Sequence, residues 1–174
     1  ERKFLKENIG IQDSIASSFG GLNYVQIPKN GKYVISPILL EENVKKSLFK
    51  RILLVFSEEQ RKASDMAFKT IRAMKKKAKD FSEIQKMPSI AKKLLLDKKL
   101  DSFGELLMEN WKIKANLDPS ISTKNVKEIT EVAKVHGAIG FKLLGAGGGG
   151  FILMYFKENE KQNFKKKFKD KLFI

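Results

Sequence analysis

The sequence predicts an α+β domain in which helices pack on an antiparallel sheet. Two observations support this fold class. Apolar runs of strand length lie near both ends of the chain, and apolar residues at helical spacing fill its middle. Segregated strands and helices are typical of α+β rather than alternating α/β proteins. The length of 174 residues and the 42% hydrophobic content allow one substantial core.

The first third of the chain is predicted to form a helix followed by a hairpin. Residues 11–19 have a short helical pattern that a Gly-Gly pair ends. Two runs with strand character follow, at residues 22–27 and 32–36, and a Pro-Lys-Asn-Gly turn joins them. The continuous apolar run at residues 51–57 has the length of a buried strand.

The rest of the chain is predicted to be helical until its last third. We expect Pro88 to separate two helices, Ser122 or Thr123 to cap another, and His136-Gly137 to close it. The predicted helices cover residues 58–79, 89–96, a segment from 101 or 102 onward, and 123–136. Strands at 139–145 and 150–156 and a basic helix at 159–170 complete the expected order.

The composition excludes several classes of site. The chain has no cysteine and one histidine, so disulfides, cysteine nucleophiles and histidine-built metal sites are not expected. No apolar run approaches the roughly 20 residues that span a bilayer, and we expect a cytoplasmic protein without a membrane partner. The net charge of +15 comes almost entirely from lysines within helical patterns. These lysines are not interleaved with aromatic residues, so we favour a solvated basic surface over a nucleic-acid site.

A run of glycines separates the last two predicted strands. Within KLLGAGGGGFILMY, five of the six residues from Gly145 to Gly150 are glycine. Bare amides of this kind suit the close approach of a phosphate, whereas a tight turn or close backbone packing is the structural alternative. The run lacks the Gly-Lys-Ser/Thr ending of a Walker A loop, and the strand that follows it excludes a dinucleotide fingerprint.

A lone carboxylate stands out near the start of the chain. Asp13 lies among small and apolar residues in GIQDSIASSFGG. Such a residue is suited to accept a proton from a substrate hydroxyl, but a helix-capping role is equally compatible with these twelve residues.

Together these two segments resemble the GHMP kinases, a family of small-molecule kinases. KLLGAGGGGFILMY, preceded by HGAIG, is similar to the third motif of that family, and GIQDSIASSFGGLNYVQI is similar to the segment that carries its catalytic aspartate. Within the family, the wording is most like the bacterial kinases that act on D-glycero-D-manno-heptose 7-phosphate. The resemblance covers nearly the whole chain. It implies a GHMP C-terminal domain with a ferredoxin-like antiparallel sheet at residues 48–174, and a remnant of the N-terminal domain at residues 1–47.

The resemblance also implies roles for particular residues. Asp13 would be catalytic, and Gly20 and Gly21 would let the chain turn beneath the sugar. Arg61 would bind substrate phosphate, as an arginine after a Thr-Gly pair does in the heptose kinases. This chain has SEEQR at that place, so an ordinary helix-surface arginine stays open. The phosphate or nucleotide loop would comprise Lys142, Gly145, Ala146, Gly147, Gly148, Gly149 and Gly150.

The implied activity is transfer of a phosphoryl group from ATP, with Mg²⁺, to the anomeric hydroxyl of the heptose phosphate. The family's Gly/Ser-rich phosphate loop has no match in this sequence, so we expect a C-terminal fragment that needs the N-terminal half of the kinase as a partner. Two alternatives remain, namely another GHMP sugar kinase of the fucose or galactose type and a non-catalytic basic binding module. A homodimer is compatible with either.

Overall fold

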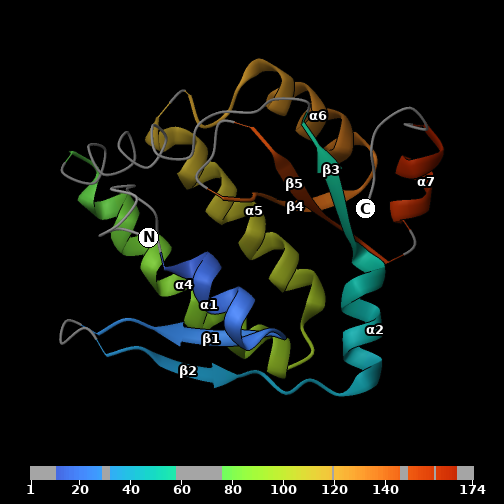
Figure 1. The fold of residues 1–174 in the computed structure, drawn as a ribbon. Helices are drawn as coiled ribbons and strands as arrows, with labels where there is room; N and C mark the ends of the chain where they lie inside the picture. The colour runs from blue at the N-terminus through green and yellow to red at the C-terminus, as the bar shows by residue number, and fades with distance from the viewer. Residues whose placement is uncertain are drawn as a thin grey trace.

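The computed structural model describes residues 11–28, 32–57, 76–118, 120–145, 149–158 and 160–167. The expected helix at 58–79 falls almost entirely outside these residues. Figure 1 shows a three-stranded sheet surrounded by helices, and a separate two-stranded hairpin next to α4. The α+β class with antiparallel sheets is therefore confirmed. No helix of the described chain is long and apolar enough to cross a membrane.

The N-terminal part forms α1 (Gln12–Phe19) and an antiparallel hairpin of β1 (Asn23–Gln26) and β2 (Val34–Pro37). Gly20 and Gly21 follow α1 with φ angles of 59° and 64°, a conformation that favours glycine. The hairpin contacts α4, where Lys92 Nζ lies 4.9 Å from the centre of the Tyr24 ring. The predicted helix and hairpin are thus confirmed.

The main sheet has the strand order β3-β5-β4, with β3 (Ile52–Phe56), β4 (Ala138–Leu143) and β5 (Phe151–Phe156). Both pairings are antiparallel, and β5, the last of the three in sequence, lies in the centre. Alternate residues of each strand point to opposite faces. The sheet therefore carries two separate sets of buried side chains.

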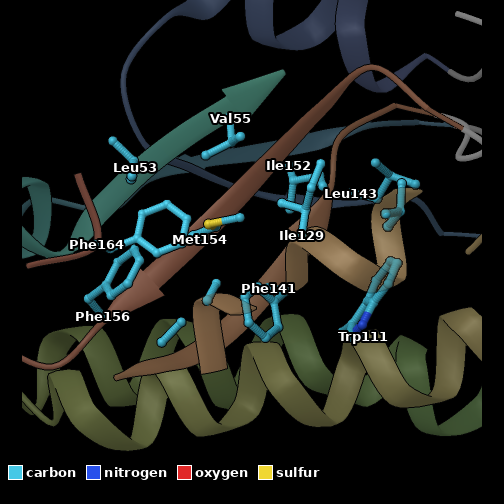
Figure 2. Close-up of a cluster of buried hydrophobic side chains, with 13 residues drawn as sticks. Leu53, Val55, Trp111, Ile129, Phe141, Leu143, Ile152, Met154, Phe156 and Phe164 are labelled. Carbon is cyan, nitrogen blue, oxygen red and sulfur yellow. The ribbon is translucent and has the colours of Figure 1, made fainter. Parts of the chain in front are cut away.

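One face of the sheet packs against α6 (Lys124–Val135) and α7 (Glu160–Lys167), with Trp111 at its border. Figure 2 shows this cluster, in which Met154 and Ile152 of the central strand lie among residues from β3, β4, α5, α6 and α7. Full burial of such a side chain contributes roughly 1.5–3 kcal/mol. The fully buried members include Val55, Val126, Phe141, Leu143, Ile152, Met154, Phe156 and Phe164.

The other face packs against α5 (Leu100–Leu117), which lies along β4. Gly104 and Gly140 meet at this contact. A Cβ on Gly140 would overlap the Gly104 carbonyl oxygen and lie 2.9 Å from Leu107 Cβ. Glycine inside a helix costs about 1 kcal/mol relative to alanine, and close approach of helix and strand is the physical reason for it here.

Two parts of the helical region differ from the sequence prediction. The prediction omitted α2 (Glu42–Arg51), whose N-cap has no side-chain hydrogen bond and whose apolar face is short, with Val44 and Leu48 buried. Pro88 does not separate two helices. It lies inside α4 (Ala78–Leu96), where burial of Met87 and Leu95 outweighs the lost backbone hydrogen bond. The remaining predicted helix ends are close to those observed, including Thr123, which caps α6 through Val126 N.

Ion pairs tie α2 to the sheet domain. Arg51, which is buried, pairs with Asp101 at the start of α5 and with Glu158 beyond β5, the latter at 3.4 Å. Lys161 of α7 donates to the carbonyl oxygens of Phe49 and Ile52 at 3.3 and 3.2 Å, and so satisfies the end of α2. The helix crosses residues 47 and 48 without interruption, and the division of the chain at that place stays a prediction.

We expect Gly140→Ala to destabilise the chain by about 2–3 kcal/mol, because the added methyl group overlaps backbone that cannot move aside cheaply. The midpoint of thermal unfolding, followed by circular dichroism, should fall by roughly 5–10 °C. Gly145→Ala is the control, since its added Cβ meets nothing within 4 Å and only its φ of 73° is unfavourable. A loss no larger at Gly140 than at Gly145 would contradict the close-packing explanation.

Candidate active site

The candidate site is the glycine loop that joins β4 to β5. Gly145, Gly149 and Gly150 have φ angles of 73°, 144° and 88°, which side chains rarely adopt. Among the described residues, a Cβ on Gly145 or Gly150 would meet no atom within 4 Å. At these two positions the glycines are therefore explained by backbone conformation, and not by close packing of another described segment.

Four elements meet at the base of this loop. Leu144 N donates to Phe151 O at 2.9 Å, and Ser57 N donates to Gly150 O at 2.8 Å. Asn125 of α6 in turn donates through its side chain to the Ser57 carbonyl oxygen. The buried Ser57 hydroxyl has no hydrogen-bond partner in the described part of the chain. The C-terminal ends of β3 and β4 and the starts of β5 and α6 thus meet at one place.

Two lysines lie beside the loop. Lys142 belongs to β4, and Lys114 comes from the last turn of α5. Lys114 Nζ donates to the Gly145 carbonyl oxygen at 3.2 Å. Both side chains are half-buried. Lys142 is predicted from sequence to belong to this site, and Lys114 adds a second positive charge next to the glycine loop.

Burial lowers the pKa of both lysines. The pKa of Lys114 falls to about 8, chiefly through desolvation and secondly through the positive charge of Lys142. Desolvation also lowers the pKa of Lys142. Among the ion pairs between described residues, none includes either lysine. Within the described part of the chain, no ion pair therefore offsets the desolvation of these two ammonium groups.

Asp13 lies in the first turn of α1 and is exposed. The N-cap of that helix is Ile11, and no side chain caps it. The capping role that the sequence left open is therefore not the one Asp13 has in this structure. Its backbone oxygen accepts from Ser17 Oγ at 2.9 Å, and no hydrogen bond or ion pair of the described residues joins its carboxylate to the glycine loop.

The remaining predicted site residues divide into two groups. Gly20 and Gly21 are exposed and form the exit from α1, where Asn23 Nδ2 donates to the Gly20 carbonyl oxygen. Arg61 lies outside the described residues, as do Ala146, Gly147 and Gly148. Among the residues that are described, no cluster of three or more His, Asp or Glu could hold a metal ion by itself.

The sequence prediction omitted Lys114. A signal for it exists, because Lys114 stands seven residues after Leu107 and three after Trp111, so it continues a buried stripe of α5. A lysine at such a position has a reduced water shell. Only the fold shows that its ammonium group reaches the glycine loop.

Comparison with known proteins supports one family. Residues 91–173 match the family model described as the GHMP kinases C terminal. The bifunctional fucokinase/GDP-fucose pyrophosphorylase of Arabidopsis thaliana is 31% identical over 160 residues, which are 87% of this chain and 15% of that protein. The D-glycero-alpha-D-manno-heptose 7-phosphate kinase of Campylobacter jejuni is 26% identical over 168 residues, 91% of this chain and 48% of that kinase.

Solved structures share the fold. A D-glycero-D-manno-heptose 1-phosphate kinase from Bacteroides thetaiotaomicron superposes with a TM-score of 0.73 and 22% identity, over 100% of this chain and 47% of that one. The mevalonate kinase of L. major, solved with R-mevalonate, superposes with a TM-score of 0.70 and 21% identity. That superposition covers 89% of this chain and 46% of the mevalonate kinase. The chain thus spans about half the length of the kinases to which it is similar, and much less of the fucokinase fusion. It belongs to the GHMP kinase family, and residues 91–173 are the C-terminal domain of that family.

Proposed function

We propose that this chain is part of an ATP-dependent sugar kinase that phosphorylates the anomeric hydroxyl of D-glycero-D-manno-heptose 7-phosphate. The observation that carries the proposal is the bare glycine loop with two half-buried lysines beside it. Backbone amides without side chains, and ammonium groups that form no ion pair with a described residue, suit a phosphorylated ligand. The similarity to a heptose 7-phosphate kinase over 91% of this chain supports the choice of sugar.

In the proposed reaction the anomeric oxygen attacks the terminal phosphorus of ATP, the bond to the bridging oxygen breaks, and ADP leaves. Asp13 accepts the proton of the attacking hydroxyl, and its exposed carboxylate has no competing ion pair in the described part of the chain. The glycine loop and Lys142 hold phosphate oxygens. Gly20 and Gly21 shape the turn next to the sugar, and Arg61 is proposed to bind the substrate's own phosphate.

The lysines and loop amides of the proposed site suit the phosphate oxygens of bound ATP in their donor chemistry. Mg²⁺ in phosphoryl-transfer sites takes one or two carboxylates together with phosphate oxygens, so it does not require a cluster of three acidic residues. When bound, it neutralises charge on the transferring phosphoryl group. We further propose that a second, N-terminal half supplies the main phosphate-binding loop, because the kinases similar to this chain are about twice as long.

A second candidate keeps the chemistry and changes the sugar. The fucokinase fusion has the higher identity, 31%, and a galactokinase of Lactococcus lactis shares the fold with a TM-score of 0.66. A fucose- or galactose-type acceptor would not need a binding site for its own phosphate. The acceptor assay therefore has to compare phosphorylated and unphosphorylated sugars.

A non-catalytic basic module is the candidate from a different class, and its support is the net charge of +15. Binding that uses this charge on nucleic acid would weaken steeply with salt. A titration of RNA at several salt concentrations measures that slope. Submicromolar binding that survives physiological salt would favour the module over the kinase.

The test of the kinase proposal is ³¹P NMR of ATP, Mg²⁺ and the heptose 7-phosphate with the chain alone and with a matching N-terminal half. We expect a new anomeric phosphate signal in the reconstituted sample and little or none with the chain alone. Parallel samples contain fucose or galactose. A product from those sugars only would replace the heptose assignment, and no product from any sugar, with the halves shown to associate, would reject the kinase proposal.

We expect Asp13→Asn to lower the rate of phosphoryl transfer by about 10²–10⁴-fold in the reconstituted kinase, because the amide cannot accept the hydroxyl proton. Folding should be unchanged, since Asp13 is exposed and caps nothing. Asp80→Asn is the matched control, an acidic residue in the first turn of α4. Equal rates for the two variants would remove Asp13 from the catalytic role.

A further inference from the structure

The packing of the fold does not explain why two lysines, Lys114 and Lys142, are half-buried near one another. They come from different elements, α5 and β4, and meet beside the glycine loop. The charge of one lowers the pKa of the other. Some other lysines of the described chain form ion pairs, as Lys134 does with Glu131 at 2.5 Å.

This arrangement works against stability. An ammonium group that loses water without gaining a carboxylate is disfavoured, and a second positive charge nearby adds to the cost. The carbonyl of Gly145 is the hydrogen-bond partner of Lys114 in the described part of the chain. A methionine would fill the same helix position without this cost. The pair is therefore better explained by a ligand than by packing.

The neighbouring backbone indicates the ligand's chemistry. Gly145, Gly149 and Gly150 add amide groups without side chains. Apart from its chain neighbours, no described residue lies within 4 Å of a Cβ built on Gly145 or Gly150. Two point charges and bare amides suit a compact dianion. A nucleic-acid backbone is less suited, because it needs an extended exposed track and these ammonium groups are half-buried.

We propose that Lys114 and Lys142 together bind the phosphate group of a substrate as a two-lysine receptor, with Lys114 transferring its hydrogen bond from Gly145 to a phosphate oxygen. This inference rests on the proposed kinase function for the identity of the substrate, but not for the binding of phosphate itself. The same chemistry is offered by a sugar phosphate and by the phosphates of a nucleotide. Lys114 is new to the site, and its partnership with Lys142 assigns a role to both.

The first test follows the Lys114 pKa by NMR of the whole chain with ¹³C-labelled lysine side chains. Inorganic phosphate should raise that pKa from about 8, whereas chloride at equal ionic strength should change it little, because a bound dianion stabilises the ammonium form. Lys142→Met should weaken phosphate binding at least tenfold. Lys112→Met is the control, an exposed lysine on the same helix.

Two further ligands identify the source of the phosphate. Glucose 6-phosphate serves as a phosphate monoester and ADP as a nucleotide. The ligand that binds more tightly indicates which class of substrate places its phosphate between Lys114 and Lys142. An unchanged Lys114 pKa with all three ligands would overturn the proposal. Because no phosphoryl transfer is needed, this result is separate from failure of the kinase assay.

The second test is the stability of Lys114→Met. The folded state lowers the Lys114 pKa to about 8 from its ordinary value of 10.5, so the folded chain binds fewer protons than the unfolded chain between those values. The loss of folding stability caused by burying the charged Lys114 is therefore fully present below pH 8, and it disappears as the pH rises toward 10.5. Lys114→Met should raise the unfolding midpoint at pH 7 and raise it less at pH 10. A lower midpoint at pH 7 would indicate a structural anchor and contradict the proposal.

Discussion

The contact between Gly104 and Gly140 sets the distance between α5 and the sheet, and the candidate site depends on that distance. Side chains normally separate the backbone of a helix from the backbone of the sheet on which it packs. Here two glycines let the backbones approach directly. Lys114 lies ten residues further along α5, roughly 15 Å away, and Lys142 lies two residues further along β4. The positions of both lysines at the glycine loop therefore depend on the backbone contact between Gly104 and Gly140.

Much of this architecture follows from local sequence patterns. Thr123 and Gly137 mark the two ends of α6, because a cap and a positive φ need those residue types. The strands around the glycine run are equally clear from their continuous apolar character. The sequence motifs around Asp13 and the glycine run are recognisable, which is why the family could be identified from sequence. Their chemical roles stay predictions.

Other features depend on tertiary contacts that no local pattern contains. Pro88 is a helix breaker by propensity, yet α4 continues through it because buried neighbours on both sides hold the helix in place. The helix α2 has few apolar residues, and its buried Arg51 is paired by Asp101 and Glu158, far away in sequence. Lys114 continues the buried stripe of α5 in sequence, but only the packing of α5 on the sheet shows that it reaches the glycine loop. Charge patterns alone could not distinguish it.

The strand order β3-β5-β4 also has a consequence for how the chain folds. The central strand is the last of the three in sequence, and β3 pairs with it across about a hundred residues, as in the pair Ile52 and Tyr155. Neither edge strand can pair with its neighbour until residues 151–156 are available. Because such non-local pairing is slow, a growing chain on the ribosome would hold β3 without a partner until β5 has been synthesised. The hairpin and α4 can form earlier from contacts nearer in sequence.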